Sequence, residues 1–212
     1  GERREESAGG ERDDGQAGRH PAQQGPGQAH EPSRRPALAQ QIAGKREQRD
    51  GQQYRHLGDA VELDRDGLQV DAFDIAEVGV AKARRLATEL GATVNFQVAD
   101  CDSFAWPEAH YDGVAAIFVQ FADPALRERL FAHMARSLKP GGTLLLQGYT
   151  PKQLEYRTGG PPLLSHLYTE TLLREAFGAM DIVELHDYEA EIAEGSGHHG
   201  RSALIGLVAR RR

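Results

Sequence analysis

The stretch LQVDAFDIAEVGVAKARRL, residues 68–86, indicates the fold class of this chain. Its first part is an apolar run that ends on an acidic residue, Asp74, and its second part places apolar residues at helical spacing. A buried strand that ends on a carboxylate and leads into an amphipathic helix is typical of a nucleotide-binding α/β unit. Such a strand normally follows an earlier strand and a glycine-rich turn about 20 residues upstream.

The segments after this stretch alternate between helix and strand. The pattern predicts a helix over residues 77–90, which Gly91 ends, and a second helix over residues 123–138 with Asp123 as its N-cap and Pro124 in its first turn. Further strands are predicted at residues 92–100, 112–121 and 143–149. This order is typical of a doubly wound, mostly parallel sheet with right-handed crossovers.

The last third of the chain has a different pattern. Residues 139–142, KPGG, are predicted to form a turn, and residues 150–162 a loop rich in glycine and proline. A short helix is predicted over residues 169–177. Two strands follow at residues 180–192 and 201–211. Because their connection is short, they are expected to pair as an antiparallel hairpin at the end of the sheet.

Composition divides the chain into two regions. Residues 1–53 contain no aromatic residue, and Leu38 and Ile42 are their only aliphatic residues larger than alanine. Such a segment buries too little apolar surface to offset its ordering entropy, so we interpret it as a disordered leader. A GC-rich coding sequence read in the wrong frame gives the same composition, and both interpretations stand. The folded domain is predicted to span residues 54–212.

Charge and cysteine content exclude several classes of function. The net charge of -7 belongs to the folded region, which argues against a nucleic-acid binder. The single cysteine, Cys101, excludes an internal disulfide and a cysteine-based zinc cluster. No apolar run approaches the roughly 18 residues of a membrane span, and no signal peptide begins the chain. We therefore expect a cytoplasmic protein without a membrane partner.

Several motifs together resemble the class I S-adenosylmethionine-dependent methyltransferases over residues 67–210. The motifs are VDAFD at 70–74, VAD at 98–100, YDGVAAIF at 111–118, LKPGGTLLL at 138–146, and the final hairpin. GYTPKQLEYRTGGPP, which starts at Gly148, and EGSGHHGRSALIGLVARR, which starts at Glu194, resemble the small bacterial branch related to tellurite-resistance and thiopurine methyltransferases. The resemblance implies a Rossmann-like sheet, S-adenosylmethionine as cofactor, and methyl transfer to a small-molecule acceptor such as a chalcogen oxyanion or a thiol.

The resemblance also implies a set of cofactor-binding residues. Asp74 is expected to accept the ribose hydroxyls, and Asp100 the adenine amino group, with the backbone at Cys101 contacting the ring. Ile75 and Phe104 are candidates to flank the adenine. The alternatives are an acid that starts a helix for Asp74, Asp102 as the cap residue of its loop in place of Asp100, and core packing for the apolar residues.

Three residues are candidates for the acceptor site. Gln120 is polar at the end of an apolar strand, although a solvated loop residue would look the same. By the resemblance, His198 lies near the acceptor pocket, where a histidine orients or deprotonates an acceptor, although a loop histidine without a role fits equally well. Arg201 suits an anionic acceptor. No metal site is expected at His198 and His199, because adjacent side chains point in different directions. No catalytic base is assigned, because the sulfonium donor is already activated and positioning dominates.

The first strand and its glycine-rich turn are missing from the sequence. Ala60, Val61 and Leu63 fit the first helix of the branch, which places the turn at residues 54–57, where the chain has YRHL. Loss of a central strand leaves its two neighbours unpaired. The enzyme is therefore expected to be impaired. A non-catalytic scaffold and a Rossmann-type oxidoreductase are the rival functions, and the LKPGG segment and closing hairpin argue against the second.

Overall fold

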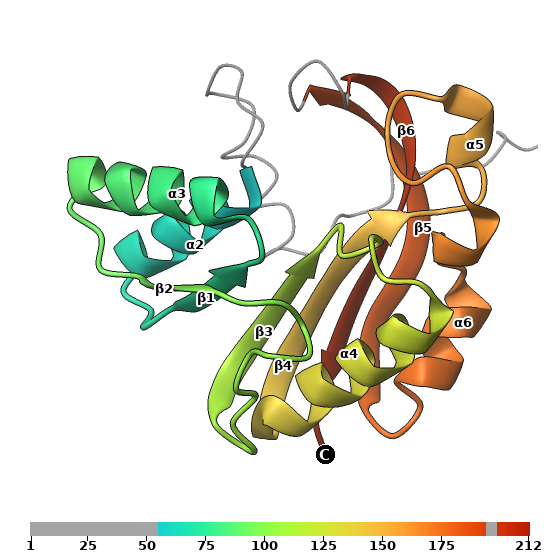
Figure 1. Ribbon diagram of the computed structural model, residues 1–212. Helices are drawn as coiled ribbons and strands as arrows, with labels where there is room; N and C mark the ends of the chain where they lie inside the picture. Colours follow the sequence, from blue (N-terminus) through green and yellow to red (C-terminus); the bar gives the residue numbers. More distant parts are fainter. Residues whose placement is uncertain (1–54, 194–198) are drawn as a thin grey trace, which may run out of the picture. The chain divides into compact units, whose positions relative to one another are not determined.

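The computed structural model describes residues 55–193 and 199–212 (Figure 1). The predicted leader, residues 1–53, and the candidate His198 therefore lie outside the described residues. Among the described residues, no helix is both long and apolar enough to cross a membrane.

The first sheet has two parallel strands, β1 (Asp71–Asp74) and β2 (Asn95–Val98). The crossover between them is helix α3 (Glu77–Leu90), which ends at Gly91 in the left-handed region, φ 68°, as predicted. Helix α2 (Arg55–Arg65) precedes β1. The apolar side of α2 packs with α3 and β2 in a small core. The buried members of this core are Ala60, Val61, Val80, Ala83, Ala87 and Phe96.

The second sheet has four strands in the order β3-β4-β6-β5. Strands β3 (Tyr111–Ile117) and β4 (Leu138–Tyr149) are parallel. Strand β6 (His199–Arg210) lies between β4 and β5 (Asp181–Ala193) and is antiparallel to both. The predicted hairpin is confirmed. The sheet ends in antiparallel pairing, with the last strand of the chain inserted inside the sheet and not at its edge.

Helices α4 (Pro124–Ser137) and α6 (Glu170–Ala176) cover one face of the second sheet (Figure 1). Asp123 caps α4 as predicted, since its Oδ1 accepts a hydrogen bond of 2.8 Å from the backbone of Leu126. Leu130, Phe131 and Met134 of α4 belong to the main core, which also holds Leu144 and Leu146 of β4. Apolar burial between these layers is the main force that stabilises this part of the fold.

Two local predictions for this region were wrong. KPGG does not form a free turn, because β4 starts at Leu138 and runs through these residues. The backbone is irregular there: Gly141 has φ 79°, and its N–H donates to the carbonyl of Arg211 at 2.7 Å. The end of the chain therefore holds KPGG in the sheet. Within the predicted loop 150–162, Gln153–Tyr156 forms the short helix α5.

The two sheets share no ladder among the described strands. Strand β1 pairs only with β2, and β3 pairs only with β4, so each keeps one open edge in the described part of the chain. This agrees with the sequence, which has no apolar strand ahead of α2 to lie between β1 and β3. The missing first strand thus has a structural counterpart in two neighbouring strands that are each paired on one side.

Candidate functional site

Asp74 is the last residue of β1, at the strand end where open α/β sheets bind ligands. Its Oδ1 accepts a hydrogen bond of 2.7 Å from the backbone N–H of Ala76, just before α3. No described residue hydrogen-bonds to its Oδ2. Asp74 therefore supports the start of the helix with one oxygen, and the ribose contact expected of this residue stays a prediction.

Asp100 follows β2, two positions beyond the strand end. Its Oδ1 accepts hydrogen bonds from the backbone of Ser103 at 2.6 Å and of Asp102 at 3.0 Å. Hydrogen bonds from Ser103, assisted by Asp102, lower the pKa of Asp100, so this carboxylate is charged near neutral pH. Asp102 instead pairs with Arg129 at 3.0 Å. Asp100 is thus the capping acid of the loop.

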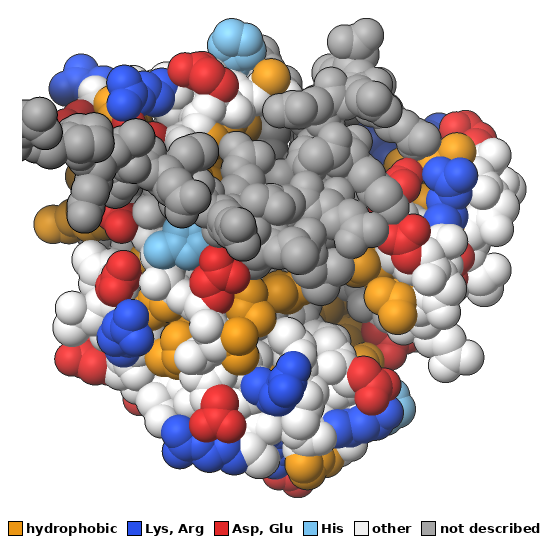
Figure 2. Space-filling view, turned by 180° about the vertical axis from the view of Figure 1, so that it is seen from behind, with side chains coloured by type: hydrophobic (Ala, Val, Ile, Leu, Met, Phe, Trp, Pro, Cys, Tyr) orange, Lys and Arg blue, Asp and Glu red, His pale blue; other side chains and the backbone are white. Residues whose placement is uncertain are grey.

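An exposed apolar surface lies beside the first of these carboxylates. Ile75 follows Asp74 and is 73% exposed, and Val98 at the end of β2 is half exposed. Hydrophobic side chains also gather near the middle of the face drawn in Figure 2. Phe104 is different: it is buried and stacks on Phe73, with ring centroids 4.2 Å apart. Ile75 is therefore exposed, and its contact with an adenine ring stays a prediction, whereas Phe104 belongs to the core.

Cys101 is buried in the main core. Burial raises the pKa of its thiol, with a further contribution from the negative charges of Asp100 and Asp102, so the thiol is neutral near pH 7. Its carbonyl accepts a hydrogen bond of 2.9 Å from Trp106 Nε1. The side chain and the carbonyl are thus both engaged in the fold. A contact between Cys101 and a ligand ring would have to use its backbone N–H.

Gln120 is buried and forms a clamp between three segments. Its Nε2 donates to the carbonyls of Tyr149 at 2.9 Å and His166 at 3.0 Å, and its Oε1 accepts from the N–H of Tyr149 at 2.6 Å. His166 Nδ1 lies 2.9 Å from the carbonyl of Gln120. Gln120 is therefore not a solvated loop residue. Both of its amide protons are engaged by protein carbonyls. The predicted contact of Gln120 with the methyl acceptor stays a prediction.

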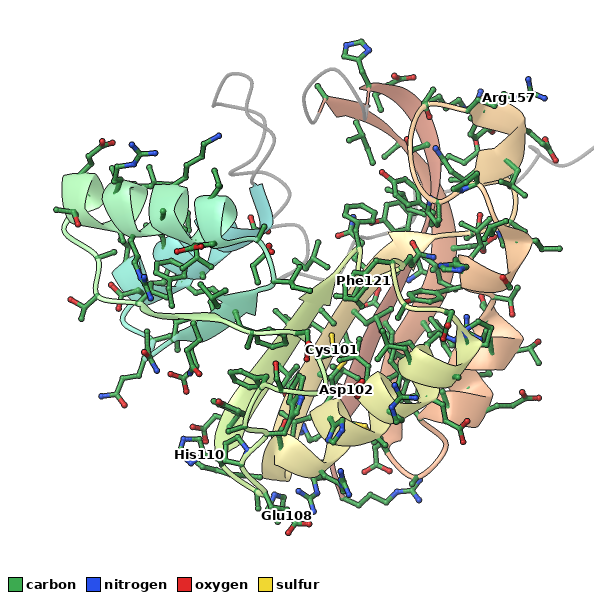
Figure 3. All side chains as sticks on the ribbon, in the orientation of Figure 1. Cys101, Asp102, Glu108, His110, Phe121 and Arg157 are labelled. Carbon is green, nitrogen blue, oxygen red and sulfur yellow. The ribbon has the colours of Figure 1, made fainter. Side chains whose placement is uncertain are left out.

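The aromatic residues beside Gln120 were not singled out from the sequence. Phe118 adopts φ 53°, a conformation that side-chain-bearing residues rarely take, and its ring stacks on Tyr149 at 4.6 Å. Phe121 is 64% exposed. Figure 3 shows Phe121 beyond the arrowhead of β3, with His110 near the opposite end of that strand. The sequence IFVQF at residues 117–121 signals aromatic residues near Gln120, but an apolar run does not reveal which ring is exposed.

Arg201 lies on β6 and is held by its neighbours. Its Nε donates to Glu189 at 2.7 Å, and its guanidinium lies 5.5 Å from the ring centre of Tyr156. Lys152 also pairs with Glu189. An anion that binds Arg201 must therefore compete with Glu189. In the described part of the chain, no group of three or more His, Cys, Asp or Glu side chains is arranged to hold a metal ion.

The ion-pair cluster around Glu189 predicts a pH effect. Hydrogen bonds from Lys152, Tyr156 and Arg201 lower the pKa of Glu189 to about 2, from an ordinary value of 4.5. The stability contributed by the cluster is therefore present above pH 4.5 and is lost as the pH falls toward 2. A carboxyl NMR titration should place the Glu189 midpoint near 2, and Lys152→Met should raise it. A midpoint near 4.5 in the unmodified protein would contradict this arrangement.

A pocket of about 250 Å³ lies on the second sheet and is lined by none of the residues proposed from the sequence. Its lining residues are Thr150, Pro151, Tyr168, Thr169, Glu170, Asp187 and Ile205. The hydroxyl of Tyr168 is buried without a hydrogen-bond partner among the described residues. Burial raises the pKa of Tyr168, so its hydroxyl stays neutral.

Comparison with known proteins finds a match for the part of the chain that holds Asp74 and Asp100. A family model described as a methyltransferase domain matches residues 55–142. The biotin biosynthesis bifunctional protein BioHC of Teredinibacter turnerae is 33% identical over 89 residues, which are 41% of this chain. The matched region is only 15% of that relative's length.

Solved structures with a similar fold cover more of the chain. TehB from Haemophilus influenzae has a TM-score of 0.58 at 16% identity, over 73% of this chain and 54% of TehB. An S-adenosylmethionine-dependent methyltransferase from Methanosarcina mazei has a TM-score of 0.58 at 19% identity, over 71% of this chain and 85% of that protein. The chain therefore has the fold of S-adenosylmethionine-dependent methyltransferases, and its residues 55–142 match the methyltransferase-domain family.

Proposed function

We propose that the chain is a cytoplasmic S-adenosylmethionine-dependent methyltransferase for a small-molecule acceptor, impaired by the absence of its first strand. One observation carries the proposal. Asp74 ends strand β1 and Asp100 follows its parallel partner β2, and each carboxylate accepts a backbone hydrogen bond through its Oδ1. Two such acceptors beside the exposed Ile75 suit the hydroxyls, amino group and flat ring of a nucleoside.

These acceptors suit the nucleoside half of S-adenosylmethionine, the cofactor of the matched family. Asp74 would hold the ribose hydroxyls and Asp100 the adenine amino group, while Ile75 and the backbone of Cys101 would contact the ring. When bound, the cofactor supplies a methyl group on a sulfonium that is already activated. The task of the protein is then to orient the two reactants and exclude water. The sequence offers no glycine-rich turn for the methionine half.

The acceptor side is proposed to lie beyond β3 and β4. Gln120 clamps the segment after β3 to Tyr149, and this clamp fixes Phe118 and the exposed Phe121. Arg201 supports an anionic acceptor such as a chalcogen oxyanion, because a guanidinium pairs with oxyanions in both charge and geometry. The competing ion pair with Glu189 means that such an acceptor would have to displace a carboxylate. A neutral thiol would not face this competition.

Ligand binding by the full chain tests the proposal. We expect S-adenosylmethionine to perturb the NMR signals of residues 74, 75 and 100 at millimolar concentration, and nicotinamide dinucleotide to leave them unchanged. Asp74→Asn should weaken this binding at least about tenfold, since it removes a charge-assisted acceptor. Asp112→Asn is the matched control, because Asp112 is an exposed carboxylate that pairs with Lys139. Binding of the dinucleotide alone would instead favour an oxidoreductase.

A non-catalytic scaffold is the second candidate function. The open edges of β1 and β3 favour it, because a chain that lacks a central strand is a poor frame for a complete cofactor site. The fold itself leaves the reaction open. The structure of the [4+2]-cyclase SpnF has a similar fold, with a TM-score of 0.56 at 20% identity. Failure of S-adenosylmethionine to bind, in a chain whose coding DNA has been verified, would support the scaffold.

A further inference from the structure

The open edge of β1 is defined by the hydrogen bonds on its other side. The carbonyls of Val70 and Asp74 accept bonds from the β2 side, from the N–H groups of Asn95 at 2.9 Å and Ala99 at 3.1 Å. Backbone groups of successive residues in a strand point to opposite sides, so Asp71 and Phe73 direct theirs away from β2. These groups have no ladder partner among the described strands.

Strand β3 is open in the same way. The N–H of Phe118 donates to the carbonyl of Gln147 on β4 at 2.8 Å. By alternation, Gly113, Ala115 and Ile117 direct their backbone groups to the side away from β4. Figure 1 shows β3 at the edge of its four-stranded sheet. Gly113 and Ala115 are exposed, although they lie in an apolar strand of the kind that is normally covered.

One side-chain contact joins the same ends of these two strands. The hydroxyl of Tyr111, the first residue of β3, donates a hydrogen bond of 3.0 Å to Oδ2 of Asp71, the first residue of β1. Phe73 of β1 also packs against the main core of the second sheet. The strands thus start at the same level without pairing. Two strands that flank a third lie about 10 Å apart, a separation that a long tyrosine side chain can bridge.

The edge of β3 lacks the protection that the other edge of its sheet has. Strand β5 is also open on one side, but it carries acidic residues that oppose pairing with another strand. These residues are Glu184, Asp187, Glu189 and Glu191. The outward-directed residues of β3 are glycine, alanine and isoleucine. Small uncharged residues leave the backbone accessible, so β3 favours strand addition where β5 opposes it.

We propose that the edges of β1 and β3 form a slot that takes up one extended, uncharged, β-branched segment of about five residues from another polypeptide. Residues 1–53 contain no run of large apolar residues that would serve as this strand. A second copy is also unsuited, because a strand in the slot needs both of its sides free, whereas the apolar strands β3, β4 and β6 are each paired on at least one side. The proposal requires no cofactor, so it stands or falls separately from methyl transfer.

Peptides with matched side chains test whether both edges take part. The probe is an eight-residue peptide with lysine at each end and valine, isoleucine and threonine between. Two further versions carry N-methyl groups on the odd or on the even amides, which removes the donors on one side of the strand. Calorimetry with the full chain should show saturable one-to-one binding of the parent peptide. Both methylated versions should bind at least tenfold more weakly.

Proline variants of the protein locate the bound peptide. Ala115→Pro removes an outward N–H of β3 and should weaken binding at least tenfold. Val183→Pro is the control, because Val183 is exposed at the register shift in β5, and it should bind the peptide unchanged. If Ala115→Pro does not fold, the methylated peptides decide alone. The proposal is overturned by absence of saturable binding, by sensitivity to only one methylated version, or by equal loss in Val183→Pro.

Discussion

Insertion of an apolar strand and a glycine-rich turn ahead of α2 is expected to raise the affinity for S-adenosylmethionine at least about 100-fold, or roughly 2.7 kcal/mol. The inserted strand would pair with β1 and β3, both of which are open among the described strands. Its turn would bring backbone N–H groups to the methionine half of the cofactor, for which the present sequence offers no glycine-rich turn. Calorimetric titration of both proteins measures the change.

A Gly/Ser insertion of equal length is the control for the added chain, and it should leave the affinity low. Asp74→Asn in the restored protein should remove most of the gain, since the ribose contact is needed in both versions. The restored protein should also no longer bind the β-branched peptide, because its own strand fills the slot. A micromolar dissociation constant for the chain as given would contradict the expectation.

Local patterns predicted the parts of the fold that depend on neighbouring residues. Gly91 and Asp123 marked helix ends that the structure confirms, because capping is set by residues close in sequence. Tertiary contacts decided the rest. KPGG is drawn into β4 by the backbone of Arg211, which is far away in the chain. Similarly, the position of β6 between β4 and β5 depends on pairing with β4, a strand far away in the chain.

In the candidate site too, features set by neighbouring residues were predicted, whereas features set by distant residues were not. The positions of Asp74 and Asp100 followed from strand ends, and the cofactor contacts expected of both carboxylates stay predictions. The role of Gln120 depended on groups 29 and 46 residues away, Tyr149 and His166, so the sequence left its environment undetermined. The positive φ of Phe118 was equally hidden, because nothing in its residue type requires that conformation.

Gln120→Leu is expected to lower the free energy of unfolding by about 3 kcal/mol, because it leaves buried backbone groups of Tyr149 and His166 without partners. Leucine keeps much of the side-chain volume, so lost hydrogen bonds dominate over a cavity. For a domain of this size the change corresponds to a fall in Tm of about 10 °C. Urea unfolding and thermal melts of the full chain measure both quantities.

Phe121→Ala is the matched control for Gln120→Leu. Phe121 is the next residue along the same segment, but its side chain is 64% exposed, so its removal should change stability by less than about 1 kcal/mol. Equal effects of the two substitutions would mean that the segment after β3 is held by general packing. A much larger effect of Gln120→Leu would show that three directional hydrogen bonds hold β3, β4 and the His166 segment together at the proposed acceptor side.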